Sequence, residues 1–228
     1  MRGAQWTIKM GENPHGLEPD WKSLTRKDLQ KAYVKRLNAK ISAKPDIRLV
    51  KIDGHRAVHK DIGEKPGLMK YTLGSWLMGK EYRIYKRLSG CTGVPRLHGR
   101  PDRWGILVEY IEGDVLNRGD PRVYDPGFFR RLHRLVEGIH ARGVVHLDLR
   151  HRGNIMITKD GNPYVIDFNG GFFLGGNPLG RRLLPWLKKV DWFGLLKLKQ
   201  RVAPHLLTAR DRTELRRFRI MRRLWLLK

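Results

Sequence analysis

The chain has 228 residues, of which 40% are hydrophobic, so it can form one large domain or two small lobes with a packed core. Its 47 lysines and arginines outnumber 22 acidic residues, and the formal net charge of +25 implies an anionic partner such as nucleic acid, phospholipid or phosphorylated glycolipid. A lone cysteine, Cys91, excludes an internal disulfide and reads as a small buried hydrophobic residue, and the absence of a signal-peptide core or a bilayer-length apolar run predicts a cytoplasmic protein.

The first 39 residues read as an N-terminal arm followed by a helix. Residues 1–22 are rich in Gly, Pro and Trp and show no period. Ser23 or Thr25 can cap a helix that runs to about Leu37. Apolar residues recur on one face of this segment, at Leu29, Tyr33, Val34 and Leu37. The pattern predicts an ordinary amphipathic helix.

Two strand-like runs come next. They cover Ile47 to Ile52 and Arg56 to Ile62, and the Asp-Gly pair at 53–54 between them is a hairpin signal. The second run places Lys60 among apolar neighbours, where a charge is costly unless it is paired. Lys60 is therefore a candidate functional residue, although a strand lysine in so basic a chain is more often structural.

A helix is expected from Trp76 to Leu88, with Gly90 beyond its end as a stop signal. Glu81 is the only acid in that helix. It could form a weak surface pair with its helix neighbours, which contributes only tenths of a kcal/mol. We instead expect Glu81 to pair with Lys60.

Further strands are expected at residues 94–97 and 104–111, and then a long helix. Asp125-Pro126 starts that helix with proline at its first position, and Gly143 stops it. Its apolar residues predict a buried face: Phe128, Phe129, Leu132, Leu135, Val136 and Ile139.

The stretch from Val144 to Gly171 carries the candidate chemistry. Two apolar runs, at residues 154–158 and 164–168, flank an Asp-Gly turn and predict a hairpin. Asp148 and Asn154 lie on one side of this hairpin and Asp167 on the other. Phosphoryl transfer needs such a set, because one carboxylate orients the attacking hydroxyl while a carboxylate and an amide oxygen hold Mg²⁺.

The last quarter of the chain holds three further features. Residues 172–186 read as a substrate-binding loop punctuated by glycine and proline, and Asp191 reads as the N-cap of a following helix. Arg212 to Lys228 predicts a basic amphipathic helix. That helix could lie on an anionic membrane, or its apolar stripe could pack on the rest of the protein with its arginines in solvent.

Several of these residues together resemble the protein-kinase-like superfamily. His146-Leu147-Asp148-Leu149 with Asn154 resembles the catalytic loop, and Asp167-Phe168-Asn169 resembles the metal-binding loop. Ala57-Val58-His59-Lys60 is similar to the strand whose lysine contacts the α- and β-phosphates. The chain departs from the family in three ways: Asn154 follows Asp148 by six residues rather than five, Asn169 replaces glycine, and no Gly-rich loop precedes Lys60.

The resemblance implies an α+β fold of two lobes, with a small antiparallel-sheet N-lobe and a mainly helical C-lobe. We expect an arm and helix at 1–39, the N-lobe at 40–112 and the C-lobe at 113–228. The implied cofactors are ATP and Mg²⁺. The implied roles can be stated residue by residue: Lys60 binds phosphate with support from Glu81; Val108, Glu109 and Ile111 line the adenine site; Asp148 is the catalytic base; Asn154 and Asp167 hold the metal; and Asp191 anchors the catalytic loop.

Within the superfamily, this chain resembles bacterial lipopolysaccharide core kinases that act on 3-deoxy-manno-octulosonic acid or heptose. The resemblance lies in its small size and in the sequence of residues 190–199. The expected function is therefore an ATP-dependent kinase for a hydroxyl of an anionic glycolipid at the inner membrane face, contacted through Arg212 to Lys228. A protein serine/threonine kinase and a catalytically silent kinase-like binding protein are the alternatives. Nucleic acid is a less favoured partner, because no aromatic-plus-basic motif is present.

Overall fold

The computed structural model describes residues 18–38, 45–65, 67, 71 and 74–226, with residues 126 and 219–226 described by their backbone alone. The chain divides into two compact units. The first comprises residues 1–78 and 97–110, and the second comprises residues 79–96 and 111–228. The expected boundaries placed residues 79–96 in the N-lobe, whereas here they belong to the second unit.

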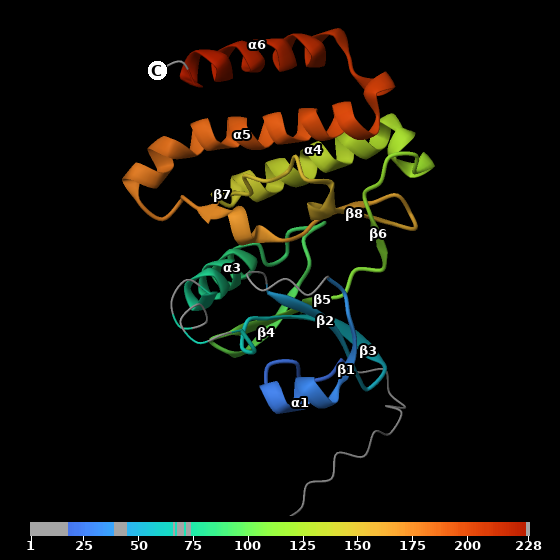
Figure 1. Cartoon of the computed structure of the whole chain (residues 1–228), viewed down its shortest axis with the longest axis vertical. Helices are drawn as coiled ribbons and strands as arrows, with labels where there is room; N and C mark the ends of the chain where they lie inside the picture. Colours follow the sequence, from blue (N-terminus) through green and yellow to red (C-terminus); the bar gives the residue numbers. More distant parts are fainter. Residues whose placement is uncertain (1–17, 39–44, 66, 68–70, 72–73, 227–228) are drawn as a thin grey trace, which may run out of the picture. The chain divides into compact units, whose positions relative to one another are not determined.

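The first unit is built on an antiparallel sheet of five strands in the order β1-β2-β3-β5-β4 (Figure 1). The strands are β1 (Tyr33–Arg36), β2 (Asp46–Ile52), β3 (His55–Asp61), β4 (Leu97–Asp102) and β5 (Gly105–Glu109). The hairpin predicted at residues 53–54 joins β2 to β3, and both turn residues have the positive φ that Asp-Gly adopts readily. The α+β class is confirmed by this sheet and the helical region that follows.

Helix α1 (Arg26–Lys31) is much shorter than expected. Thr25 caps it, as predicted, in a capping box with Asp28. The chain then turns into β1, which pairs with β2, so Tyr33 and Val34 lie on a strand and are exposed. The prediction of a helix to Leu37 was wrong because strand pairing overrode a weak helical period, and aromatic and β-branched residues favour strands.

Packing and ion pairs hold α1 against the sheet. A buried cluster comprises Trp21, Leu29, Val50, Ala57 and Leu107. The Arg26 guanidinium donates to Asp61 at 2.8 Å and to Asp102 at 2.6 Å, and so ties the helix to the ends of β3 and β4.

Helix α3 (Ser75–Arg87) agrees with the expected helix, and its last turns belong to the second unit. That unit also contains α4 (Pro126–Ala141), α5 (Pro178–Val202) and α6 (Ala209–Leu226). It holds a three-stranded sheet of β6 (Gly113–Val115), β8 (Ile155–Thr158) and β9 (Pro163–Val165), and a short pair formed by β7 (Val144–Val145) and β10 (Phe172–Phe173). The described part of this unit also contains short 3-10 turns, which are η2 (Pro121–Tyr124), η3 (Arg152–Asn154), η4 (Phe168–Gly170) and η5 (Pro204–Leu206).

The core of the second unit forms where α4 packs on β7, β9 and α5 (Figure 1). Asp125 caps α4 by accepting from Gly127 N, with Pro126 at the first position, as predicted. The predicted apolar face is buried except at Phe129, which is half-buried, and Phe128, Leu132 and Val136 are fully inaccessible. Cys91 is also buried, as expected, and burial raises the pKa of its thiol.

Helix α5 begins earlier than the sequence suggested. Asn177 accepts a hydrogen bond from Gly180 N at 2.6 Å, and Pro178 follows it at the first helical position. The loop predicted at residues 172–186 is therefore wrong for its second half. An Asn-Pro start is a recognised helix signal, and the internal Pro185 concealed it.

Candidate functional site

The candidate catalytic loop runs from β7 to β8 in the second unit, and His146 fixes its entry. This histidine is fully buried. Its Nε2 donates to the carbonyl of Ile166 at 3.0 Å, and its Nδ1 accepts from the Asp148 backbone N–H at 3.3 Å. Burial lowers the pKa of His146, so the imidazole is neutral. His146 therefore braces the loop against the residue that precedes Asp167 and does not act as a base.

Asp191 of α5 holds the same loop through its carboxylate. The carboxylate is almost completely buried and accepts from the backbone N–H groups of His146 at 2.9 Å and Leu147 at 2.6 Å. It also accepts from His140 Nε2 at 2.8 Å. Interpreting Asp191 as a helix N-cap was wrong, because α5 begins at Pro178 and Asp191 lies in its interior. The anchoring contacts to the loop are those that the resemblance implied.

Gly194, one turn later on α5, lets the helix backbone approach the loop closely. A Cβ at this position would lie 3.0 Å from the backbone nitrogen of Arg150 and 3.3 Å from the carbonyl carbon of Leu149. These neighbours are backbone atoms, which cannot move aside as a flexible side chain can. Asp191 and Gly194 thus both hold α5 against the loop. Asp191 does so by hydrogen bonding, and Gly194 does so by leaving space for the loop backbone.

Two residues of the site have strained backbones. Leu147 and Asp167 both have φ of 64°, and within the described part of the chain the third non-glycine residue with positive φ is Asp53 in the β2–β3 turn. Such conformations cost about 1–3 kcal/mol each and persist where the surroundings enforce them, often at functional sites. At Leu147 the enforcing group is the Asp191 carboxylate, which bonds its backbone nitrogen.

The structure brings Asp148 and Asn154 together despite the extra residue between them. Asn154 is buried in η3, and its Nδ2 donates to the Asp148 Oδ2 and to the Asp148 main-chain oxygen, each at 3.0 Å. The other carboxylate oxygen of Asp148 lies 3.4 Å from Arg150 Nε. The Asp148 side chain is 43% exposed, so an acceptor hydroxyl can reach it.

Asn169, which replaces a glycine of the family pattern, contacts the candidate metal ligand. Its Nδ2 donates to the Asp167 Oδ1 at 2.7 Å. Its own Oδ1 is buried and, within the described residues, has no hydrogen-bond partner. Its main-chain oxygen accepts from Lys80 Nζ at 2.6 Å. Asp167 is therefore held from α3 through Asn169.

Lys80 is a site residue that the sequence interpretation missed. It is buried, and this burial lowers the pKa of its ammonium while the neighbouring Glu81 raises it. A signal was present, because Lys80 lies three residues after Leu77 and four before Ile84, on the apolar face of α3. A lysine on a buried helix face needs a hydrogen-bond partner, and Lys80 finds one in the main-chain carbonyl of Asn169.

The oxygen atoms of Asn154 and Asp167 fit a hard divalent cation. Because Asn154 donates through Nδ2, its Oδ1 carries no hydrogen bond among the described residues. Mg²⁺ uses one or two carboxylates together with water and substrate phosphates, rather than a cage of protein ligands alone. Among the described residues there is no group of three or more His, Cys, Asp or Glu side chains that could hold a metal.

The predicted nucleotide-binding residues fall in both units. In the first unit Lys60 is buried on β3, opposite Ile106 of β5. Val58 lies opposite Val108, so Lys60 and Val108 share one face of the sheet, while Glu109 points to the other. Ile111 and Glu81 belong to the second unit. The pairing of Lys60 with Glu81 and the adenine site that includes Ile111 stay predictions.

No protein-family model matches this sequence, and no curated protein matches it either. No helix within the described residues is long and apolar enough to span a membrane.

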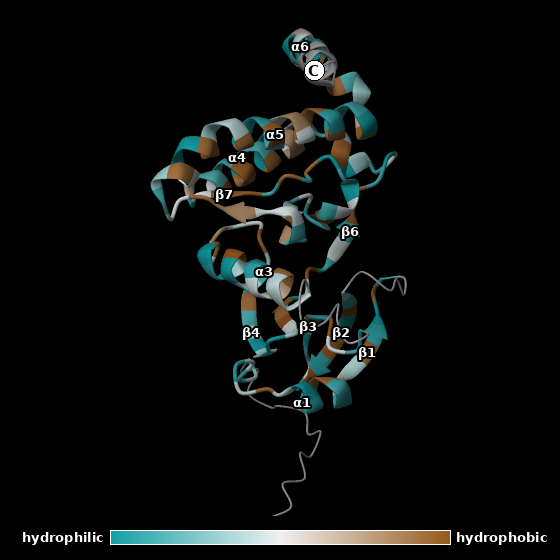
Figure 2. Ribbon diagram, turned by 60° about the vertical axis from the view of Figure 1, so that its left-hand side comes forward, coloured by the Kyte–Doolittle hydropathy of each residue, from teal (hydrophilic) through white to brown (hydrophobic). Residues whose placement is uncertain are grey.

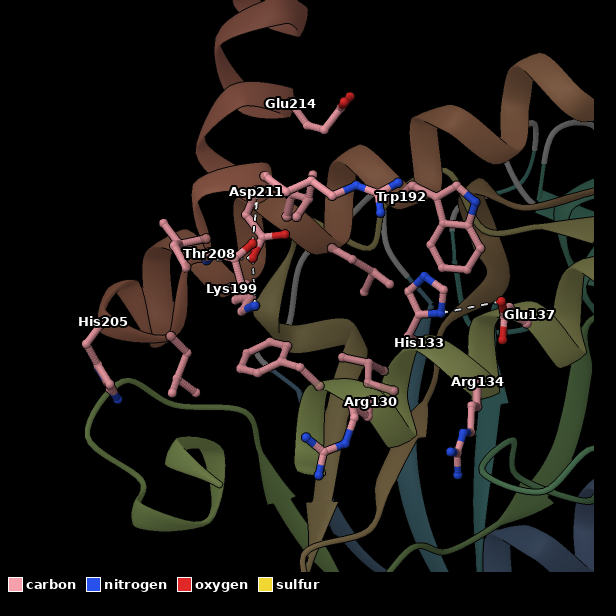
Figure 3. Close-up of a pocket in the computed structure, with 17 residues that line it drawn as sticks. Arg130, His133, Arg134, Glu137, Trp192, Lys199, His205, Thr208, Asp211 and Glu214 are labelled. Carbon is pink, nitrogen blue, oxygen red and sulfur yellow. Dashed lines mark hydrogen bonds and ion pairs between the residues drawn. The ribbon is translucent and has the colours of Figure 1, made fainter. Parts of the chain in front are cut away.

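A separate cavity of about 1080 Å³ lies between α4, α5 and α6 (Figure 3). Two of its lining residues form an ion pair, with Lys199 Nζ 2.8 Å from Asp211 Oδ2. Burial acts to raise the pKa of Asp211, but the hydrogen bonds from Lys199 and Thr208 lower it. The cavity contains none of the residues of the Asp148 site. Its lining lacks the paired carboxylate and amide that make the Asp148 site chemically specific.

Proposed function

We propose that this protein is an ATP- and Mg²⁺-dependent phosphotransferase with a protein-kinase-like fold, which moves the γ-phosphate to a hydroxyl of a lipopolysaccharide core sugar. The observation that carries the proposal is the Asp148–Asn154 contact, on a loop anchored by Asp191 and His146. A surface hairpin with solvated carboxylates would need neither the buried anchor nor the strained Leu147.

The chain's own residues have distinct tasks in this reaction. Asp148 orients the acceptor hydroxyl and takes its proton, and Asn154 fixes the direction of that carboxylate. Asn154 and Asp167 offer the oxygen atoms that would hold Mg²⁺, which when bound neutralises charge on the transferring phosphate. Lys60 is the proposed contact of the α- and β-phosphates, with Glu81 as its partner. Catalysis then depends on positioning and charge compensation rather than on covalent chemistry.

The charge of the chain supports an anionic acceptor. Two residues after Asp148 begins an exposed run of Arg150, His151 and Arg152, in which both arginines are positively charged. The Arg150 side chain is 66% exposed and lies on the Asp148 side of the loop. A phosphorylated sugar would be attracted to this edge, and the net charge of +25 extends that preference to the whole chain. This agrees with a glycolipid at the inner face of the membrane.

Purified protein incubated with γ-labelled ATP tests the proposal. We expect Mg²⁺-dependent transfer of label to a deacylated core oligosaccharide and little transfer to a generic protein substrate. Label on protein instead would assign a serine/threonine kinase. If no ATP is bound or consumed with or without Mg²⁺, the phosphotransferase is rejected, and the silent binding protein that the missing Gly-rich loop suggests takes its place.

A further inference from the structure

The first half of α5 exposes a row of large apolar side chains. They are Leu179 at 68%, Leu183 at 45%, Trp186 at 68% and Val190 at 41% exposed. Their spacing of four, three and four residues places them on one face of the helix. Because each residue advances a helix by about 1.5 Å, this apolar face is roughly 16 Å long.

This apolar face does not pack on the rest of the described second unit. Apart from Gly180, the buried residues of α5 all lie at or after Asp191. In α4, by contrast, the apolar stripe is inaccessible, as at Phe128 and Leu132. Figure 2 shows hydrophobic and hydrophilic residues interleaved along α5. A contiguous exposed apolar face of this kind marks an interaction surface.

Positive charge lies along one edge of the same face. At about 100° per residue, Arg182 and Lys189 flank the apolar residues, while Arg181 and Lys188 lie on the opposite side of the helix. No acidic residue occurs between Asp167 and Asp191, and Asp191 itself is buried. The Lys189 ammonium lies 4.7 Å from the centre of the Trp186 ring. An aromatic ring with a cation over its face suits a boundary between hydrocarbon and anionic headgroups, because the ring is apolar and the ammonium stays near the polar side.

We propose that the face of α5 formed by Leu179, Leu183, Trp186 and Val190 docks on an anionic phospholipid bilayer, with the helix lying in the plane of the interface. An amphipathic helix binds such a surface through buried apolar area together with attraction between basic residues and anionic lipid. This inference does not rest on the proposed phosphotransfer, and its test involves no nucleotide.

The charge pattern distinguishes a bilayer from a second copy of the chain. In a symmetric dimer through this face, the flanking Arg182 and Lys189 of one copy would lie near the same residues of the other, and like charges facing one another disfavour association. An anionic bilayer presents the opposite sign over its whole area. The bilayer is therefore the occupant that the charge favours.

The site on α5 also differs from the membrane contact expected in α6. Phe218 of α6 stacks on Phe193 of α5 with ring centres 3.4 Å apart, so this residue packs on the protein. That contact supports the second of the two expectations for the C-terminal helix. Met221 and Trp225 follow Phe218 at helical spacing, and the structure describes only their backbone.

Vesicle flotation tests the proposal with the full-length chain. We expect binding to phosphatidylcholine vesicles that contain phosphatidylglycerol and much weaker binding to phosphatidylcholine alone. The double substitution Leu183→Ser and Trp186→Ser should lower binding at least about tenfold, because two large apolar groups no longer enter the interface. Trp76→Ser is the matched control, since Trp76 is a helical tryptophan with 51% exposure, and it should change binding less than about twofold.

Charge and depth can be measured separately. Replacing Arg182 and Lys189 by glutamine should weaken binding to the anionic vesicles more than replacing Lys27 and Lys31, which are exposed on α1. Brominated lipids should quench the fluorescence of Trp186, and the quenched component should disappear in Trp186→Phe. Wild-type protein that ignores anionic vesicles, or a wild-type dimer that dissociates when Trp186 is replaced, would overturn the proposal.

Discussion

Asn154 donates through one amide nitrogen to both a side-chain oxygen and the main-chain oxygen of Asp148, six residues earlier in the chain. The double contact requires the intervening residues to form a compact turn, and η3 provides it by ending at Asn154. The additional residue relative to the kinase pattern is accommodated in this turn. The two groups that the chemistry needs therefore remain in contact.

Asp148→Asn should lower phosphotransfer by about 10²-fold or more, since a positioned base contributes that order, while ATP binding stays largely intact. The amide that replaces the carboxylate is similar in size and cannot accept the hydroxyl proton. Turnover measured with labelled ATP and nucleotide affinity measured by titration calorimetry separate the two effects.

Asp160→Asn supplies the control for that substitution. Asp160 is an exposed acid in the β8–β9 turn, so it has the same charge change without a place in the site. The turnover of the Asp160→Asn variant should stay within about twofold of wild type, because surface substitutions usually have small effects. Equal losses in the two variants would assign the effect to net charge and remove Asp148 from the role of base.

Lys80→Met should reduce turnover by roughly tenfold or more, because the Asn169 carbonyl loses its charged donor and Asp167 is then less firmly held. Methionine retains the length and apolar stem of lysine. Lys86→Met, an exposed lysine on the same helix, is the control and should have little effect. A positioning role predicts that raising the Mg²⁺ concentration partly restores the activity of Lys80→Met. If Mg²⁺ has no influence, Lys80 only stabilises the fold.

The sequence predicted those features that depend on local chemistry. The turn at 53–54, the cap of α4 and the Asp-Gly hairpin at 159–162 all follow from residues next to one another in the chain, and each was confirmed. The candidate site residues Asp148, Asn154 and Asp167 stand out in the sequence because they are polar groups beside apolar strands.

Features that depend on distant partners could not be predicted from the sequence. Tyr33 and Val34 joined a strand because β2 was available to pair with them, which no local period reveals. The role of Asn169 required the position of Lys80, far away in sequence. The exposed face of α5 was hidden for the same reason, since amphipathic spacing alone does not tell which face lacks a partner.

Asp191→Asn should destabilise the second unit by about 3 kcal/mol, because a fully buried carboxylate accepts from two backbone nitrogens and an imidazole, and the amide can satisfy fewer of them. The strained φ of Leu147 would also lose its support. Urea denaturation followed by circular dichroism measures the change. Asp114→Asn, in an acid that is mostly exposed on β6, should shift stability by less than about 0.5 kcal/mol. A loss of that small size in Asp191→Asn would show that the loop has another anchor.

The buried His59 should make the stability of the first unit depend on pH. It is buried on β3, and among the described residues its Nε2 has no hydrogen-bond partner. Burial lowers the pKa of His59 from 6.5 to about 4. Between these values the unfolded chain binds a proton that the folded chain does not, so stability falls as the pH falls from 6.5 towards 4.

The expected loss from His59 between pH 7 and about pH 5 is roughly 2 kcal/mol, and it is measured as the free energy of unfolding in urea at the two pH values. In His59→Leu the change in the free energy of unfolding between the two pH values should be smaller by about that 2 kcal/mol. It should not vanish, because burial also lowers the pKa of His146 and contributes with the same sign. His151→Leu, which removes an exposed histidine, should leave the difference unchanged. An identical pH dependence in wild type and His59→Leu would mean that His59 is protonated in the folded chain and has found an acceptor.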